Sequence, residues 1–167
     1  MKKYELTEET FTVFGKTLYR IRAVRDFGSV KAGEFGGYIE KEENLSHFGD
    51  AWVYDDAKVY GDAKVSGDAR VYGNARVYGN AWVYGNAEVF NTRHFFVQGP
   101  IGSRDGYVTF YRTKDDTVEV RCGCFSGSLQ EFVNQVEETH GGSRYEKEYK
   151  LAVELAKVCI RLEGESR

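Results

Sequence analysis

Residues 49–90 repeat one pattern of small, polar and apolar positions in seven consecutive six-residue units without an insertion. The units read GDAWVY, DDAKVY, GDAKVS, GDARVY, GNARVY, GNAWVY and GNAEVF. The third position is always Ala and the fifth always Val, from Ala51 and Val53 to Ala87 and Val89. Residues two apart in an extended chain point to the same side, so the Ala and Val positions predict an interior and the variable fourth position an outer face. The Gly-Asp or Gly-Asn step that opens most units supplies turn residues, so each unit is expected to be a short strand followed by a corner.

A strand and corner repeated at this period predict a solenoid of stacked coils. The array resembles the left-handed parallel β-helix of the hexapeptide-repeat proteins, in which a small residue follows an aliphatic one four positions later, as in Val53 with Ala57 and Val83 with Ala87. The resemblance implies three units per coil, so that residues 18 apart stack. The array departs from the family pattern after the aliphatic residue, where an aromatic side chain stands in most units: Tyr54, Tyr60, Tyr72, Tyr78, Tyr84 and Phe90, with Ser66 in the remaining unit.

Stacking of residues 18 apart predicts ladders on the outer surface. Tyr54, Tyr72 and Phe90 fall in one ladder, and Tyr60 with Tyr78 in another. The outer positions pair Trp52, Arg70 and Glu88 on one face, Lys58 under Arg76, and Lys64 under Trp82. These ladders are either packing between rungs or a subunit interface, because contiguous exposed aromatics mark contact surfaces. Hexapeptide β-helices are commonly trimers, so the resemblance implies a homotrimer whose interface contains Trp52, Tyr54, Tyr72, Trp82 and Tyr84.

The segments on either side of the array change period. Residues 10–24 predict two strands that turn near Gly15 and Lys16, within an amino-terminal β cap over residues 1–36. The solenoid is expected over residues 37–96, with degenerate upstream units that place Ile39 and Leu45 on the Ala position.

Residues 97–167 are expected to form a small α+β domain of the ββαα or βββαα type. Residues 107–112 and 117–121 predict a hairpin. Ser128 and Glu131 form a capping box that opens a helix, and Gly141 with Gly142 ends it. A second helix is expected over residues 145–162. The predicted fold class is therefore mainly β: a left-handed parallel β-helix with an amino-terminal β cap and a carboxy-terminal α+β domain.

Composition and charge exclude several classes of function. Hydrophobic residues make up 41% and charged residues 29% of the 167, and no apolar run is long enough to span a bilayer. The formal charge is −3 without a basic block, so nonspecific nucleic-acid binding and membrane-surface binding are disfavoured. Acidic residues stand near the start where a signal peptide is apolar, so we expect a cytoplasmic protein.

The cysteines predict no metal site and no disulfide framework. There are three, and Cys122 and Cys124 are one residue apart. They are too few for a four-thiolate zinc site, and an odd number suits reduced thiols. The stretch Cys122-Gly123-Cys124-Phe125 is expected to be a turn from a strand to a helix. No cofactor and no metal are expected.

Acyl transfer is the enzymatic hypothesis that the family resemblance raises, since many hexapeptide β-helices are acetyltransferases with a histidine base near a subunit boundary. His47 and His94 flank the array and are the candidates for that base. Those enzymes generally insert a loop into the solenoid to build a substrate pocket, and residues 49–90 contain no insertion. Catalysis is therefore disfavoured.

The candidate ligand site lies in the carboxy-terminal domain. Its turn, Gly102-Ser103-Arg104, offers backbone N–H groups, a hydroxyl and a guanidinium, which suit an anion such as a phosphate. The alternative is a plain linker turn, because the spacing fits neither of the common nucleotide-binding loops. Other side chains of the domain are expected to converge on the turn, with aromatic rings stacking on a base: Thr109, Tyr111, Arg112, His140, Arg144 and Tyr145.

The whole chain resembles hexapeptide-repeat proteins of bacteriophages and prophages. The likeness rests on residues 36–39 and 44–46, the repeat array, and the tail segments 102–104, 123–125 and 139–141 with Tyr145. The resemblance implies a protein of a bacterial host cell that binds and sequesters a small anionic ligand of the nucleotide type, as an antagonist of host defence. Two alternatives stay open: a module that grips a host or phage protein through the Trp/Tyr face, and an acyltransferase.

Overall fold

The computed structural model describes residues 1–163 and divides into two compact units. The first is Met1–Thr92 and the second begins at Arg93. The sequence analysis placed the start of the carboxy-terminal domain at residue 97, and the border in the structure lies four residues earlier. Within residues 1–163, no helix is both long and apolar enough to cross a membrane.

The amino-terminal strands extend one face of the solenoid. Strands β1 (Tyr4–Val13) and β2 (Lys16–Ala23) form an antiparallel hairpin, and β3 (Phe35–Ile39) pairs with β2. The hairpin turns at Phe14 and Gly15, as predicted, although β1 begins well before residue 10. Because β3 then runs parallel to β5, the sheet order is β1-β2-β3-β5-β8.

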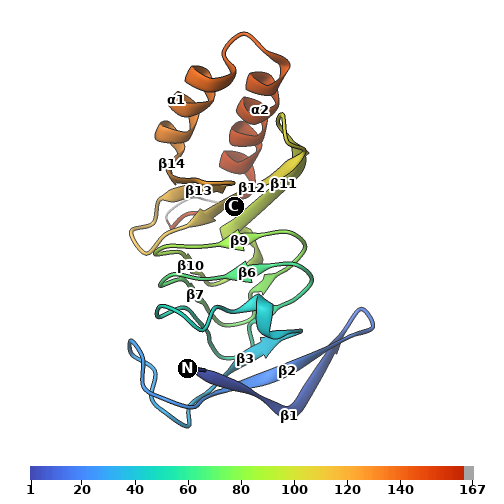
Figure 1. Ribbon diagram of the computed structural model, residues 1–167, viewed down its shortest axis with the longest axis vertical. Coiled ribbons are helices and arrows are strands. Elements are labelled where there is room, and N and C mark those ends of the chain that lie inside the picture. Colours follow the sequence, from blue (N-terminus) through green and yellow to red (C-terminus); the bar gives the residue numbers. More distant parts are fainter. Residues whose placement is uncertain (164–167) are drawn as a thin grey trace. The chain divides into compact units, whose positions relative to one another are not determined.

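The repeat array forms two-residue strands that stack in parallel (Figure 1). The strands are β4 (Trp52–Val53), β5 (Lys58–Val59), β6 (Lys64–Val65), β7 (Arg70–Val71), β8 (Arg76–Val77), β9 (Trp82–Val83) and β10 (Glu88–Val89). Each pairs with the strand three units on, so Val53 lies beside Val71 and Val71 beside Val89. This confirms stacking of residues 18 apart. Every Ala and Val of the repeat is at most 1% exposed, which confirms the interior face.

The first coil is out of step with the repeat, and the predicted placement of Ile39 and Leu45 is wrong. Ile39 pairs with Val59 and Leu45 with Val65, so both occupy the Val position and not the Ala position. The reason is an eight-residue unit between Leu45 and Val53, which holds two more residues than the other units. A short 3-10 helix, Glu42–Asn44, precedes it.

Side chains from the amino-terminal segment satisfy main-chain carbonyls of the first coils. The Lys3 ammonium donates to the carbonyl oxygens of Ala51 at 2.7 Å and Gly49 at 3.2 Å. The Tyr4 hydroxyl donates to the carbonyl of Leu45 at 2.8 Å. Both side chains are fully buried, so these bonds replace the hydration that the ammonium and hydroxyl lose on folding.

The same segment covers Trp52, so the prediction that this side chain lies on an exposed outer face is wrong. Trp52 is fully buried. Its ring packs edge-on against Phe27, with 5.2 Å between the ring centroids, and against Tyr4 at 6.1 Å. Gly36 allows its own main chain to lie close to Trp52, because a Cβ there would lie 2.5 Å from the Val53 carbonyl oxygen and 2.7 Å from the Trp52 ring.

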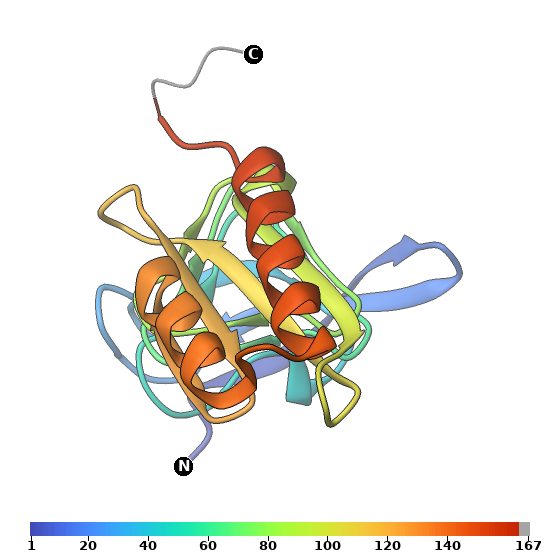
Figure 2. The same ribbon diagram turned by 90° about the horizontal axis from the view of Figure 1, so that it is seen from above.

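The second unit is a four-stranded antiparallel sheet with two helices on one face (Figure 2). A 3-10 helix, Thr92–His94, leads into it. Its elements are β11 (Phe95–Ile101), β12 (Gly106–Arg112), β13 (Val118–Cys122), β14 (Phe125–Ser128), α1 (Leu129–His140) and α2 (Arg144–Cys159). The parallel solenoid ladder therefore ends at Val89 and not near residue 96, since Phe95 pairs with Tyr111 in the antiparallel sheet.

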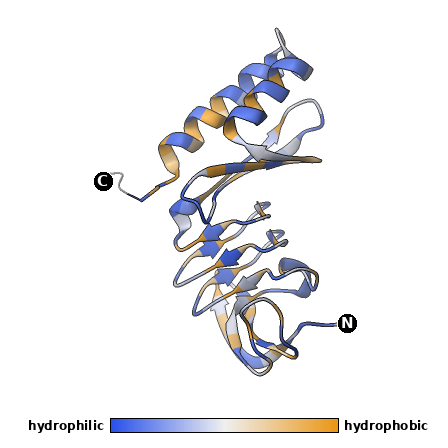
Figure 3. Cartoon of the chain, turned by 90° about the vertical axis from the view of Figure 1, so that its left-hand side faces the viewer, coloured by the Kyte–Doolittle hydropathy of each residue, from blue (hydrophilic) through white to orange (hydrophobic). Residues whose placement is uncertain are grey.

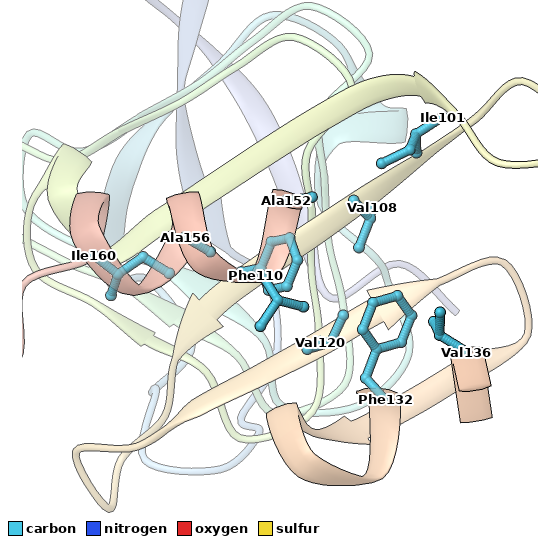
Figure 4. Close-up of a cluster of buried hydrophobic side chains, with 10 residues drawn as sticks. Ile101, Val108, Phe110, Val120, Phe132, Val136, Ala152, Ala156 and Ile160 are labelled. Atoms are coloured by element: carbon cyan, nitrogen blue, oxygen red, sulfur yellow. The ribbon is translucent and has the colours of Figure 1, made fainter. Parts of the chain in front are cut away.

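The core of this unit lies between the sheet and the helices (Figure 4). Val108, Phe110 and Val120 point from the strands toward Phe132 of α1 and Ala156 of α2. The predicted hairpin and capping box are confirmed: Arg112 pairs with Val118, and Ser128 and Glu131 exchange hydrogen bonds.

The prediction of a strand-to-helix turn at Cys122-Gly123-Cys124-Phe125 is wrong. Cys122 and Phe125 are paired residues of β13 and β14, so Gly123 and Cys124 form the tight turn of a hairpin. Gly123 has φ +56°, the left-handed conformation that such a turn requires. Strand β14 then precedes the helix.

Overfilling the solenoid interior should destabilise the fold. Ala75 is fully buried, so Ala75→Leu is expected to lower the free energy of unfolding by about 1–3 kcal/mol. Arg76→Leu, on the adjacent outward and exposed position, should change it by less than about 0.5 kcal/mol. Urea denaturation followed by far-UV circular dichroism compares the two. Equal losses in both variants would contradict the assignment of the interior.

Lys3 should make stability depend on pH. Burial lowers the pKa of Lys3 from 10.5 to about 8, although nearby Asp50 opposes the change. Because the folded-state pKa is below the unfolded one, the unfolded chain holds more protons in this window, and stability rises with pH through it. Relative to Lys3→Met, the wild-type chain should therefore gain stability between about pH 8 and about pH 10 in denaturant titrations. A relative loss over that range would show that charge burial does not dominate at Lys3.

Candidate functional site

A pocket of about 170 Å³ opens between α1, α2 and the end of β13. It is lined by Cys122, Phe132, Gln135, Val136, Thr139, His140 and Tyr149. Phe132 and Val136 also belong to the hydrophobic core, so the floor of the pocket is apolar (Figure 4). Polar groups stand above this apolar floor, with the Gln135 amide donating to the Thr139 hydroxyl at 2.9 Å. An apolar cavity with a few polar groups is the usual form of a small-molecule site.

Tyr149 is the central side chain of this pocket. Its ring stacks on His140, with 5.7 Å between ring centroids and an interplanar angle of 28°, and meets Phe132 edge-on at 5.5 Å. Its hydroxyl lies 3.9 Å from the Cys122 sulfur. A Cβ on Gly102 would lie 2.0 Å from the hydroxyl oxygen, so only glycine allows the β11–β12 turn to come this close.

The thiol and the phenol of the pocket are both neutral at physiological pH. Burial raises the pKa of the Cys122 thiol, so the reactive thiolate is disfavoured. Burial also raises the pKa of Tyr149 to about 12, with the neighbouring Cys122 acting in the same direction. The pair therefore lacks the activated nucleophile that covalent catalysis requires. The pocket can donate hydrogen bonds from a hydroxyl and a thiol, and it offers aromatic faces for stacking.

The structure brings four of the predicted ligand-site residues to this region. His140 and Tyr145 contact each other, with ring centroids 5.8 Å apart, at the junction of α1 and α2. Arg144 lies over the Tyr145 ring at 5.3 Å and its side chain is 79% exposed. Gly102 approaches from the β11–β12 turn. Ser103 and Arg104 follow it in the same turn and are exposed.

The Gly102 turn does not offer its N–H group to an anion. That N–H donates to a Glu148 carboxylate oxygen at 2.9 Å, and the same carboxylate lies 3.9 Å from Arg144. A protein carboxylate thus occupies the position that the sequence assigned to a phosphate. The exposed Arg144 side chain supplies positive charge at the junction of α1 and α2.

Three predicted ligand-site residues lie elsewhere in the second unit, so their predicted convergence with the turn is wrong. Thr109 and Tyr111 alternate with Val108 and Phe110 on β12 and point to the sheet face opposite the helices. Arg112 is buried at the end of β12, where it pairs with Asp116 at 2.8 Å and with Glu163 at 3.2 Å. These two carboxylates already neutralise its charge.

Sequence reasoning missed four polar or aromatic lining residues of the pocket, namely Cys122, Gln135, Thr139 and Tyr149. Cys122 was assigned to a turn and weighed only as a zinc ligand or a disulfide partner. Tyr149 falls within the predicted second helix, but its spacing of four from Tyr145 was not used. That spacing brings both rings to His140.

The two histidines proposed for acyl transfer occupy structural positions. His47 stacks on Tyr4 at 4.2 Å, and its Nδ1 accepts the Lys3 N–H at 3.3 Å. Burial lowers its pKa, against the effect of nearby Glu42. His94 is buried, and burial followed by the neighbouring Arg112 guanidinium lowers its pKa. Low pKa values keep both imidazoles neutral, but neither lines the pocket described above.

The predicted aromatic ladders are confirmed. Tyr54 stacks on Tyr72 with 4.5 Å between ring centroids, Tyr72 lies 5.1 Å from Phe90, and Tyr60 stacks on Tyr78 at 5.4 Å. Elsewhere on the array, the Trp82 indole N–H donates to the Ser66 hydroxyl at 2.9 Å, and Trp82 meets Tyr84 edge-on at 6.3 Å.

Comparison with known proteins agrees with the repeat architecture. Residues 69–85 match the family described as YdcK Beta solenoid repeat, so the chain contains a β-solenoid repeat. Over 63 residues it is 38% identical to an Escherichia coli (strain K12) protein named "Uncharacterized acetyltransferase YdcK". That similarity covers 33% of this chain and 19% of the relative, so the chain spans less than a fifth of the relative's length.

The rate at which the Cys122 thiol is alkylated should report how far the pocket shields its sulfur. The exposed Cys124 is expected to react with iodoacetamide at neutral pH well before Cys122, whose raised pKa and partial burial both slow alkylation. Tyr149→Ala should raise the Cys122 rate several-fold by uncovering the sulfur, whereas Tyr107→Ala, a control at an exposed ring of β12, should not. Peptide mass spectrometry measures each site. Equal rates for Cys122 and Cys124 in the unaltered chain would contradict this description.

Proposed function

We propose that this protein acts by binding and not by turnover, and that the pocket between α1 and α2 holds a small ligand. The arrangement around Tyr149 carries the proposal. Its ring and that of His140 are stacked and fixed by Phe132, and the adjacent thiol and phenol are protonated. These features suit recognition of a flat molecule and do not suit nucleophilic chemistry.

The ligand class that we propose is a small anionic molecule of the nucleotide type. A pocket of about 170 Å³ is smaller than a typical drug-sized site, so it takes one ring and leaves the rest of the ligand outside. A base fits the aromatic lining, and hydroxyl and thiol donors face its acceptors. The exposed Arg144 and Arg104 are suited to the phosphate outside the pocket.

The solenoid is proposed to be left-handed and to assemble the chain into a homotrimer, with Tyr54, Tyr72, Trp82 and Tyr84 near the contact. Partly exposed aromatic ladders support this placement, because such surfaces favour association. Sequestration of a host-defence signal in the cytoplasm of a phage-infected bacterium remains our proposal for the biological role. Several equivalent sites in one assembly would suit sequestration.

The binding proposal is tested by isothermal titration calorimetry with AMP and cyclic di-AMP, together with mass spectrometry of any ligand released on denaturation. Tyr149→Ala and Arg144→Ala are expected to weaken binding at least about tenfold, which corresponds to the loss of one stacking or charge-assisted contact. Lys157→Ala, on an exposed part of α2 outside the pocket, is the control. No heat with either nucleotide and no released ligand would refute the nucleotide class.

Acetyl transfer is the second candidate, favoured by the name of the Escherichia coli relative. It is tested by incubating the protein with acetyl-CoA and amine substrates while free thiol is measured. If this candidate is correct, His94→Ala or His47→Ala should abolish turnover without loss of folding. We expect no release of thiol above that of a heat-denatured control, and turnover that depends on either histidine would overturn the binding proposal.

A further inference from the structure

A carboxylate stands beside the guanidinium that we assign to the ligand's phosphate. Glu148 lies one turn after Arg144 on α2, and its Oε1 atom is 3.9 Å from the Arg144 Nε atom. The Glu148 and Arg144 side chains are 37% and 79% exposed, so a ligand can reach both of them from solvent. A phosphate that pairs with Arg144 therefore also meets the negative charge of Glu148.

The β11–β12 turn fixes the position of this carboxylate. Its second oxygen, Oε2, accepts a hydrogen bond from the Gly102 N–H group at 2.9 Å. A partly exposed Glu side chain samples several rotamers, and a hydrogen bond between a main-chain N–H and a carboxylate favours one of them. The negative charge of Glu148 is therefore held next to Arg144 before any ligand arrives.

Two observations connect Glu148 with the pocket at Tyr149. A Cβ on Gly102 would lie 2.0 Å from the Tyr149 hydroxyl oxygen, so the residue that binds Glu148 also lies against the central side chain of the pocket. Burial raises the pKa of Tyr149 to about 12, and Cys122 and the Glu148 charge act in the same direction. The Glu148 carboxylate is thus close enough to act on a ligand in this pocket.

The charged side chains around Glu148 balance each other. The first two turns of α2 are hydrophilic (Figure 3), and Lys150 in the second turn pairs with Glu137 and Glu146, each at 2.8 Å. Residues 144–150 and the paired Glu137 contribute three positive and three negative side chains: Arg144, Lys147, Lys150, Glu137, Glu146 and Glu148. The β11–β12 turn adds one of each sign, Arg104 and Asp105. The repulsion that Glu148 exerts on an anion at Arg144 is therefore not outweighed by a surplus of cations among these residues.

The charge of a phosphate depends on how it is esterified. A monoester carries nearly two negative charges at pH 7, because its second pKa is about 6, whereas a diester carries one. The second charge gains little attraction here, because Glu148 opposes Arg144 with a charge of equal size. It still loses hydration when the phosphate is bound, and that loss grows with charge. A diester is therefore the better match for this pair of side chains.

We propose that Glu148 is a specificity-determining residue of the pocket, and that it makes the site prefer a nucleotide whose phosphates are diesters over one with a phosphate monoester. This inference rests on the binding function proposed above and adds the chemical class that the site selects. Glu148 acts by competing with the phosphate for Arg144, and Gly102 holds it in the position from which it competes. Cyclic nucleotides, whose phosphates are all diesters, belong to the preferred class.

Calorimetric titration with three ligands tests this role. Adenosine, cyclic AMP and AMP share one base and carry zero, one and nearly two negative charges. The wild-type chain should bind cyclic AMP at least about threefold more tightly than AMP. Glu148→Gln keeps an acceptor for the Gly102 N–H and removes the charge, so it should tighten AMP binding about three- to tenfold, cyclic AMP binding by less, and adenosine binding not at all.

The matched control is Glu154→Gln. Glu154 is also an exposed carboxylate of α2, and it pairs with Lys157 at 2.9 Å, outside the surroundings of Arg144. This substitution changes the net charge by the same amount, so it should leave all three affinities unchanged. An equal change of the three affinities in Glu148→Gln would show a structural effect and overturn the role of Glu148, as would AMP binding that does not change.

Inorganic phosphate separates this role from the pocket itself, because it has no base. A nuclear magnetic resonance titration follows the Gly102 main-chain amide, and phosphate should bind Glu148→Gln several-fold more tightly than wild type or Glu154→Gln. If phosphate shows this difference while adenosine and both nucleotides fail to bind, the pocket proposal is wrong and the competition by Glu148 stands. If the nucleotides bind and phosphate shows no difference, the role of Glu148 is wrong and the pocket proposal stands.

Discussion

The architecture of the first unit depends on the narrow space between stacked parallel strands. Each rung of the array contributes one Ala and one Val to the interior, and none of these side chains is more than 1% exposed. Neighbouring coils are separated by a single strand spacing, so a larger residue has no room and a polar one has no partner. The two inward positions of the repeat are therefore always Ala and Val, whereas the outward fourth position varies between units. The 18-residue register then decides which outer side chains meet, including the stacked tyrosines.

A solenoid also has to cover its first coil. Here the amino-terminal segment does so with polar and apolar contacts at once. The Lys3 ammonium and the Tyr4 hydroxyl donate hydrogen bonds to main-chain carbonyl oxygens, and the Asn44 amide donates to the carbonyl oxygen of Ala63 at 2.8 Å. Phe27 and Tyr4 cover the Trp52 ring. Burial of a lysine here is tolerable because its ammonium donates to two carbonyl oxygens and lies over the Phe27 ring.

Strong periodicity made most of the fold predictable from the sequence, and its failures have identifiable causes. The interior of the array, the tyrosine ladders and the Ser128 cap follow local rules of spacing and capping. The first coil was placed wrongly because two extra residues between Leu45 and Val53 have no signature in the repeat. Trp52 was expected outside because a repeat pattern says nothing about what another segment will cover. The convergence expected for the ligand site failed at Thr109 and Tyr111, since strand alternation sends them to the other face of the sheet.

The pocket itself was only partly foreseen. His140 and Tyr145 were among the side chains expected to converge on the Gly102 turn, whereas Cys122 came to the site through a hairpin that the sequence had not indicated. A long-range contact such as that between Gly102 and Tyr149 depends on how β11, β12 and α2 assemble, which no local pattern records. The turn at Gly102 also depends on a long-range contact. Glu148 from a helix distant in the sequence accepts the hydrogen bond of the N–H group that an anion would have used.

The eight-residue unit before Val53 has one more consequence. Parallel pairing is regular on both sides of it, from Ile39 with Val59 to Trp52 with Arg70. The strands before and after the lengthened corner therefore stay paired with their neighbours, because the two added residues lie in the corner and not in a strand. The corner tolerates this extra length at Phe48, which is 83% exposed, while its other residues contact the amino-terminal segment.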